Sequence, residues 1–222
     1  MNLFRCDSTV VHGCRTTSRL HISGSTLPVV RSRDRRCIGW SLDNPLRRWW
    51  APARSEVELL SVESGQHVAD LGAGVGFLTS ALLGRVGPSG TVLLVDPDAR
   101  NLSVARARWG SDPRVRSLVA SAAAIPSIPD GSIDRVMLSL ALCCLVDKAG
   151  ALDEAWRILR PAGLALVSYP ERRGWRGRSK RSLRVTPEMW SRLVVRHPWT
   201  TVESHRKRFI RRHLLEKPAD AR

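Results

Sequence analysis

The chain has few cysteines, and their arrangement excludes two common ways of stabilising a small protein. Only five occur in 222 residues: Cys6, Cys14, Cys37, Cys143 and Cys144. Their number is odd and their spacing does not match that of metal ligands, so neither a disulfide scaffold nor a structural zinc site is expected. The adjacent pair Cys143-Cys144 follows an apolar run, and core packing is favoured there over catalysis or metal binding.

Long hydrophobic runs are also missing. The longest apolar stretch, Val136 to Val146, is interrupted only by Ser139, whereas a membrane-spanning helix needs about 20 apolar residues. No bilayer-crossing segment is therefore predicted. The hydrophobic fraction is nevertheless 43%, which is enough for a core and excludes disorder of the whole chain.

Acidic residues are scarce at both ends of the chain. Residues 1–50 carry a net charge of +6, residues 51–170 of −1 and residues 171–222 of +11, within a total of +16. Residues 1–40 form an Arg-rich and Ser-rich leader without clear periodicity. This leader is interpreted as a disordered basic tail, a mitochondrial transit peptide within residues 1–36, or a translation start placed too far upstream. The expected location is cytoplasmic, or mitochondrial if the leader is a transit peptide.

The central region alternates short apolar runs with helical patterns. The expected strands are His67–Leu71, Thr91–Val95, Val115–Val119, Asp134–Leu138 and Leu164–Tyr169, and the expected helices lie near Arg54–Val62, Phe77–Arg85, Ala99–Trp109 and Ala149–Leu159. Continuous apolar strands separated by helices indicate a parallel sheet covered on both faces. The prediction is an α/β fold, a Rossmann-like doubly wound sheet in three α-β-α layers, over residues 41–222.

The last third follows a different pattern. Residues 171–185 are polar and basic and are expected to form a loop or insertion. Thr186-Pro187-Glu188 combines an N-cap, a proline at the first helical position and an acid in the first turn, so a helix is predicted from there to about His197. Thr200–Ser204 and Phe209–Leu215 are expected to form a terminal strand pair.

A glycine-rich segment, Asp70-Leu71-Gly72-Ala73-Gly74-Val75-Gly76, lies between a predicted strand and a predicted helix. Glycines let the backbone turn tightly and approach a ligand at a helix N-terminus. Twenty residues after Gly76 the next strand ends at Asp96, whose carboxylate can accept hydrogen bonds from both hydroxyls of an adenosine ribose. The glycine spacing is G-x-G-x-G rather than the dinucleotide G-x-G-x-x-G, so NAD binding is the minor alternative.

From Asn44 to Pro218 the chain resembles the class I S-adenosylmethionine (SAM)-dependent methyltransferases, in the methyltransferase-domain group that includes ubiquinone-biosynthesis-like enzymes. The resemblance rests on the segment from Asp70 to Gly76, on Val95-Asp96-Pro97, on Pro129–Asp134 and on Glu154–Gly163. It implies a seven-stranded sheet whose last strand is antiparallel, with SAM as the cofactor.

The same resemblance assigns cofactor-binding roles. Gly72, Ala73 and Gly74 would lie along the methionine part of SAM, Asp96 would hold the ribose hydroxyls, Pro97 would pack on the adenine, and the backbone at Ala122 would meet the adenine ring. Asp70, Gly76, Ser121 and Ser139 complete the candidate cofactor site. No metal ligand and no catalytic residue is assigned, and the methyl acceptor, a small molecule or RNA, is not identified.

Two segments depart from the family pattern. Ala120–Ala124 contains no acid where many relatives contact the adenine amino group, although Ser121 can still accept a hydrogen bond. After the fourth strand, Leu138–Leu145 offers only Ser139 and two thiols where relatives often present polar residues. Methyl transfer from SAM depends mainly on alignment, so these changes limit the choice of nucleophile without excluding catalysis.

The basic ends suggest an alternative function. Arg172–Arg181 combines cations with glycines and one tryptophan, and further cations follow within Arg206–Arg212. Cations neutralise phosphates and aromatic rings stack on unpaired bases. The alternative is therefore a non-catalytic methyltransferase-fold protein that binds RNA through these segments, while a solvated basic loop explains the same residues equally well. The acceptor site is expected near Ser139–Cys144 and a helix around Asn44–Trp50.

Overall fold

A computed structural model describes residues 19–22, 25–28, 43, 52–170, 185–207 and 210–221. The chain divides into two compact units, residues 1–31 and residues 32–222. In the first unit, β1 (Arg19–Ile22) and β2 (Ser25–Pro28) form an antiparallel hairpin. The rest of the leader, the expected helix around Asn44–Trp50 and the segment Arg172–Arg181 lie outside the described residues.

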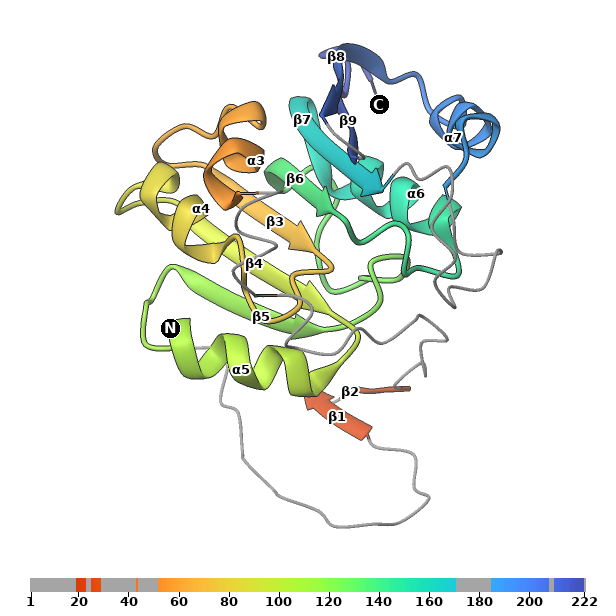
Figure 1. Cartoon of the computed structure of the whole chain (residues 1–222). Coiled ribbons are helices and arrows are strands. Elements are labelled where there is room, and N and C mark those ends of the chain that lie inside the picture. Colours follow the sequence, from red (N-terminus) through yellow and green to blue (C-terminus); the bar gives the residue numbers. More distant parts are fainter. Residues whose placement is uncertain are drawn as a thin grey trace. The chain divides into compact units, whose positions relative to one another are not determined.

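The second unit is built on one seven-stranded sheet (Figure 1). Its strands run in the order β5-β4-β3-β6-β7-β9-β8, and β9 runs antiparallel to both β7 and β8, whereas the pairs from β5 to β7 are parallel. The α/β fold and the antiparallel last strand predicted from the sequence are confirmed. The bounds are β3 (His67–Leu71), β4 (Thr91–Asp96), β5 (Val115–Val119), β6 (Ile133–Ser139), β7 (Leu159–Pro170), β8 (Thr200–Lys207) and β9 (Ile210–Glu216).

Five helices are described in this unit: α3 (Ala53–Leu59), α4 (Thr79–Val86), α5 (Ala99–Trp109), α6 (Lys148–Ile158) and α7 (Pro187–Val194). Three of these helices begin at an N-cap residue whose side chain accepts a hydrogen bond from a backbone N–H. Asp98 accepts a hydrogen bond from the N–H of Arg100, Asp147 from that of Gly150, and Thr186 from that of Met189. None of the helices in the described ranges has the length and apolar content that crossing a bilayer requires.

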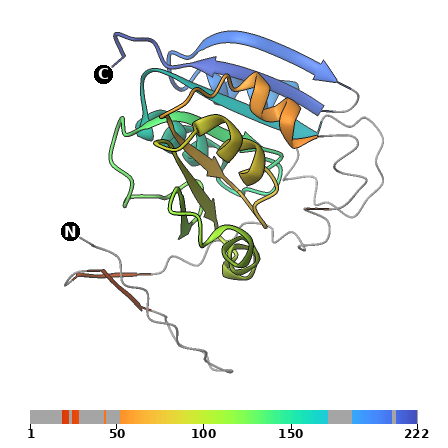
Figure 2. The same ribbon diagram turned by 90° about the vertical axis from the view of Figure 1, so that its left-hand side faces the viewer.

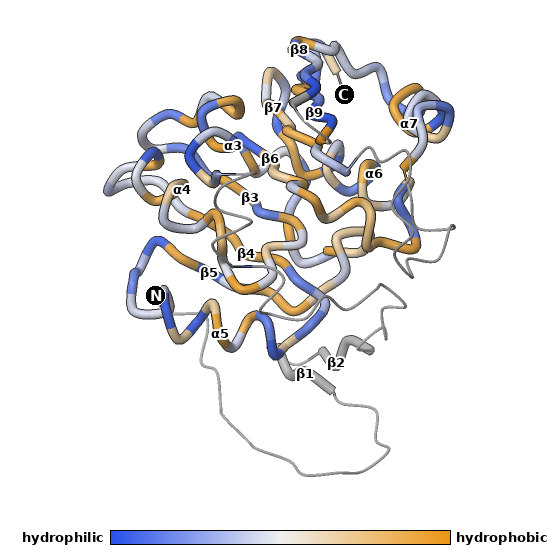
Figure 3. The backbone as a smooth tube through the Cα atoms, in the orientation of Figure 1, coloured by the Kyte–Doolittle hydropathy of each residue, from blue (hydrophilic) through white to orange (hydrophobic). Residues whose placement is uncertain are grey.

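The helices cover both faces of the sheet. One buried cluster joins α6 and α7 to residues such as Leu138, Val167 and Leu215, and a second joins α3, α4 and α5 to Met137, Leu166 and Leu214. Consecutive residues of one strand therefore face opposite layers, as the pleat requires. Figure 2 views the sheet from the side that carries α3 and α4, and Figure 3 shows how hydrophobic the central strands are.

The connection between β5 and β6 contains no helix. It is held instead by Arg157 of α6, whose guanidinium donates to the carbonyl oxygens of Ile125 (3.1 Å) and Ile128 (2.7 Å). Glu154, one turn earlier, accepts from the N–H of Ile125 (2.9 Å) and pairs with Arg157. This side-chain network fixes the connection that passes the end of β4, next to the glycine-rich loop.

Candidate functional site

The glycine-rich loop follows β3 in a conformation that glycine permits. Gly72, Gly74 and Gly76 have φ angles of 86°, 58° and 76°. The N–H groups of Gly72 and Ala73 both donate to the carbonyl oxygen of Val95, at 2.7 and 3.0 Å. A Cβ atom on Gly72 would lie 2.4 Å from the Cβ of Ala141, so only glycine fits there. The loop is thus held between the end of β4 and the segment after β6.

Asp96, the last residue of β4, is 7% exposed and faces this loop. Its Oδ2 accepts from the N–H of Gly74 at 2.9 Å, and its Oδ1 accepts from the N–H of Asp98 at 2.9 Å and from the amide of Asn101 at 3.4 Å. Burial raises the pKa of Asp96 above 3.8, and the hydrogen bonds from Asp98, Gly74 and Asn101 oppose that rise. A carboxylate accepts about four hydrogen bonds, so Asp96 retains capacity for a ligand.

The segment after β5 reaches the same place through its backbone. The N–H of Ala120 donates to the carbonyl oxygen of Asp96 at 3.3 Å. Ser121 is half-buried, and its hydroxyl accepts from the N–H of Ala123 at 3.3 Å. The side chain of Ala122 is buried in the apolar core, which leaves its backbone as the part available to a ligand. Pro97, directly after Asp96, is half-buried.

The other two predicted residues occupy different surroundings. Asp70 is buried within β3, before the glycines, and is 2% exposed. Ser139 is buried at the end of β6 and belongs to a separate polar network, although Ala141, two residues later, contacts the loop at Gly72. The structure therefore brings together the glycine loop, Asp96 and residues 120–122, and it connects Ser139 to them through Ala141.

Sequence reasoning missed three residues of that network: Glu56, Ser168 and Arg212. Glu56 in α3 is 1% exposed and Arg212 in β9 is 4% exposed, and Nε of Arg212 donates to Oε1 of Glu56 at 2.7 Å. The hydroxyl of Ser139 donates to Oε2 of Glu56, and the hydroxyl of Ser168 donates to that of Ser139, both at 3.3 Å. A buried, hydrogen-bonded ion pair thus lies beside the predicted acceptor region.

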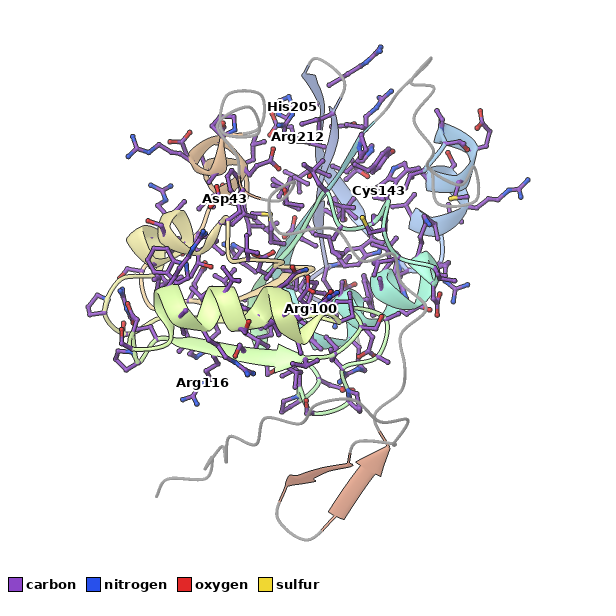
Figure 4. The ribbon with its side chains drawn as sticks, turned by 60° about the horizontal axis from the view of Figure 1, so that its bottom comes forward. Asp43, Arg100, Arg116, Cys143, His205 and Arg212 are labelled. Carbon is purple, nitrogen blue, oxygen red and sulfur yellow. The ribbon has the colours of Figure 1, made fainter. Side chains whose placement is uncertain are left out.

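The position of Arg212 corrects one expectation. The sequence placed Arg206–Arg212 on a basic surface for RNA, but Arg212 is buried and paired with an acid. Strand alternation is the signal that could have found it, because Arg212 shares a face with the buried residues Ile210 and Leu214. Arg206 is exposed, as expected. Figure 4 labels Arg212 and its cross-strand neighbour His205.

The two adjacent thiols lie half-buried in the turn after β6, beside the apolar core that contains Ala141, Leu142 and Leu145. Their Sγ atoms are 3.9 Å apart, and the thiol of Cys143 donates to the carbonyl oxygen of Leu140 at 3.2 Å. Among the described residues, no group of three or more His, Cys, Asp or Glu side chains is arranged to hold a metal ion.

Comparison with known proteins finds a family match over part of the chain. Residues 69–167 match the family described as methyltransferase domain, and these residues contain the glycine loop, Asp96 and Ser139. A ubiquinone/menaquinone biosynthesis C-methyltransferase, UbiE, from Hahella chejuensis is 37% identical over 125 residues, which cover 55% of this chain and 49% of that protein. Residues 69–167 therefore resemble a methyltransferase domain.

Solved structures support the fold of this chain. A SAM-dependent methyltransferase from Aquifex aeolicus superposes with a TM-score of 0.72 at 15% identity, covering 82% of this chain and 100% of that one. The cyclase SpnF superposes with a TM-score of 0.61 at 16% identity, covering 79% of this chain and 66% of that one. The fold thus also occurs in a protein named for other chemistry, and function has to be argued from the site. The chain spans about half the length of the curated relatives it matches.

Proposed function

We propose that the protein is a SAM-dependent C-methyltransferase that methylates a ring carbon of a hydroquinone-type aromatic acceptor. The observation that carries the cofactor part is the hydrogen bond from Gly74 N–H to the buried carboxylate of Asp96, at the carboxyl ends of β3 and β4. Ligands of open α/β sheets bind at this edge of the strands. The acceptor class is taken from the relatives, which are named ubiquinone/menaquinone biosynthesis C-methyltransferases.

The residues present fit the cofactor. Gly72 and Gly74 have positive φ angles that shape the loop after β3, and the positive end of α4 begins four residues beyond Val75. Asp96 supplies a carboxylate for the ribose hydroxyls, while Pro97 and the backbone of residues 120–122 would border the adenine. When bound, SAM supplies an activated methyl group on a cationic sulfur. The protein then has to align donor and acceptor and exclude water.

The absence of an acid in residues 120–124 lowers the expected affinity. A hydrogen bond to a charged group contributes about 1.5–3 kcal/mol, so its loss weakens cofactor binding by roughly tenfold or more. Ser121 provides a neutral acceptor in this segment instead. We therefore expect a dissociation constant for SAM in the range of about 1 μM to 1 mM, typical of enzyme substrates.

The first experiment is a calorimetric titration of the protein with SAM. The wild type should bind, Asp96→Ala should bind at least about tenfold more weakly because charged hydrogen bonds to the ribose are lost, and Asp220→Ala, which changes an exposed acid near the C-terminus, should match the wild type. A folded wild-type protein that does not bind SAM would refute the proposed function.

The second experiment tests the acceptor with radiolabelled SAM. The protein is incubated separately with 1,4-dihydroxynaphthalene kept reduced, with 1,4-dimethoxynaphthalene, and with total cellular RNA. Label should enter the dihydroxynaphthalene at a ring carbon, which mass spectrometry of the product locates. Label in RNA and none in the hydroquinone would show that the acceptor class is wrong.

A further inference from the structure

A row of polar residues crosses one end of the sheet on the side covered by α3. Ser139 of β6, Ser168 of β7, Arg212 of β9 and His205 of β8 are successive cross-strand partners. Two residues earlier along β6, the corresponding row is apolar across β6, β7 and β9, where it consists of Met137, Leu166 and Leu214, and it ends at Glu203 on the edge strand β8. The face of the sheet thus changes from apolar to polar at the carboxyl ends of β6 and β7, next to the glycine loop.

The guanidinium of Arg212 is held in a fixed orientation within this row. Its Nε and Nη2 both contact Oε1 of Glu56, at 2.7 and 2.5 Å. Oε2 of Glu56 is fixed in turn by Ser139, Ser139 by Ser168, and Ser168 by the N–H of Leu140 at 3.1 Å. Leu140 has a φ of 56°, a conformation that costs a residue with a side chain about 1 kcal/mol or more.

One side of this guanidinium makes no hydrogen bond to the part of the chain that the structure describes. Nη1 of Arg212 is buried and has no hydrogen-bond partner among the described residues. Leaving a buried charged donor unsatisfied is costly, and such exceptions are typical of functional sites. A buried ion pair is itself rarely needed for stability, because the cost of desolvating two charges offsets their attraction.

We propose that Arg212 positions the methyl acceptor by donating from Nη1 to its ring hydroxyl oxygen, which it binds as an oxyanion. This inference rests on the proposed function. Arginine stays protonated at every relevant pH, so the contact favours the ionised form of the hydroxyl and lowers its pKa in the complex. Glu56 acts through Arg212, since it holds the guanidinium and balances its charge.

The ionised hydroxyl is the form of the acceptor that can attack. Its electron density reaches the neighbouring ring carbon, which forms a bond to the methyl carbon as the bond from methyl to sulfur breaks. The electron pair of that bond stays on sulfur, so an anion and a sulfonium give a neutral ketone tautomer and a neutral thioether. The ring carbon then loses its proton to water and the oxygen regains one, which restores the hydroquinone.

The test is the pH dependence of kcat, which reports ionisations within the complex with 1,4-dihydroxynaphthalene, in the wild type and in Arg212→Gln. At neutral pH the variant should lose about tenfold or more, the magnitude of one charged hydrogen bond. Its acidic limb should move to higher pH, toward the ionisation of the free hydroquinone, and the rate should recover in alkaline solution. SAM affinity should stay unchanged. Arg116→Gln, an exposed arginine on β5 at the other end of the sheet, is the matched control and should keep the wild-type profile.

Two outcomes would overturn the assignment. One is an equal loss of kcat at every pH, which indicates a structural role, and the other is an unchanged pH profile of kcat. If Arg212→Gln does not fold, the double variant Glu56→Gln/Arg212→Gln leaves no buried charge and must show the same shift of the acidic limb. A wild type that transfers no methyl group refutes the proposed function, whereas a wild type that does so with an Arg212-independent profile refutes only this inference.

Discussion

The Cβ of Ala141 occupies the space that a side chain at residue 72 would need, 2.4 Å from where the Cβ of that residue would lie. The contact joins the turn after β6, which leads to the two cysteines, to the loop after β3. The glycine loop is therefore constrained twice, by its own positive φ angles and by the neighbouring segment. A change in this contact should therefore alter both the loop after β3 and the turn after β6.

Gly72→Ala should destabilise the protein by about 2–4 kcal/mol, because an alanine at φ 86° is strained and its methyl group overlaps Ala141. SAM affinity should fall as the loop shifts. Urea denaturation and calorimetry measure both effects. In the double variant with Ala141→Gly, the protein should regain the stability lost through the overlap of the two methyl groups. It should not regain the stability lost through the positive φ angle.

The matched control is Gly84→Ala in α4, where an added Cβ meets nothing within 4 Å. There the substitution should stabilise the helix by about 1 kcal/mol. Equal effects at positions 72 and 84 would contradict the close approach of Ala141.

SAM affinity should depend on pH through Asp96. Because burial raises its pKa in the folded protein above 3.8, the ionised form is complete only at a higher pH than in the unfolded chain. A carboxylate accepts hydrogen bonds from both ribose hydroxyls, so affinity should rise as pH increases from 3.8 through the raised pKa. Calorimetry over that range measures this, and Asp96→Asn should remove the dependence.

The stability of the ligand-free protein should change in the opposite direction. The contribution of Asp96 to folding is greatest below 3.8 and is lost as pH rises through its raised pKa. Asp112, whose pKa is lowered by the Arg114 side chain, provides the contrast, since its contribution is present above 3.8 and is lost as pH falls. Thermal denaturation of Asp96→Asn and Asp112→Asn should therefore show pH dependences of opposite sign relative to the wild type.

Arg157→Met should destabilise the fold by about 2–3 kcal/mol, because the carbonyl oxygens of Ile125 and Ile128 and the carboxylate of Glu154 lose their donor. Arg157 also lowers the pKa of Glu154, so that pair stabilises the protein above pH 4.5 and the contribution is lost as pH falls through the lowered pKa. Urea denaturation should show that stability falls less between neutral and acidic pH in the variant than in the wild type. Arg160→Met removes a more exposed pair with Asp134 and should cost no more than about 1 kcal/mol.

Glu56→Gln should cost about 3–5 kcal/mol, since it leaves the guanidinium of Arg212 buried without an opposite charge. The double variant Glu56→Gln/Arg212→Gln should recover a large part of that loss. Chemical denaturation of the wild type, the two single variants and the double variant gives the coupling energy between the two residues. Glu58→Gln, on the exposed side of the same helix, should change stability by no more than about 0.5 kcal/mol. Additive losses in the double variant would mean that the two residues do not interact.

The sequence predicted the order of strands and helices because apolar runs and helical patterns alternate clearly between His67 and Tyr169. The family resemblance assigned Gly74 and Asp96 to one cofactor site, and the structure pairs their strands β3 and β4 in parallel. The start of α4 differs by two residues: Thr79 begins it rather than Phe77, because Gly76 N–H and Thr79 N–H first form turns with Ala73 and Gly76.

The pairing of Glu56 with Arg212 could not be predicted. Neither residue lies in a motif, and both belong to types that are usually exposed. Only the completed sheet brings them together, because β9 inserts between β7 and β8 and carries Arg212 under α3. The contacts of Ser139 and Ser168 follow from the same insertion, since their register across β6 and β7 depends on tertiary pairing.

The Glu56–Arg212 pair also orders events during synthesis. The two residues are 156 positions apart, and a ribosome adds about 5–20 residues per second, so roughly 8–30 s separate their appearance. During that interval the nascent chain holds an acid in α3 whose partner has not been made, and burying it is unfavourable. Closure of α3 onto the sheet therefore waits for β9, so the side of the sheet that carries Arg212 is completed after the glycine loop and Asp96 have been made.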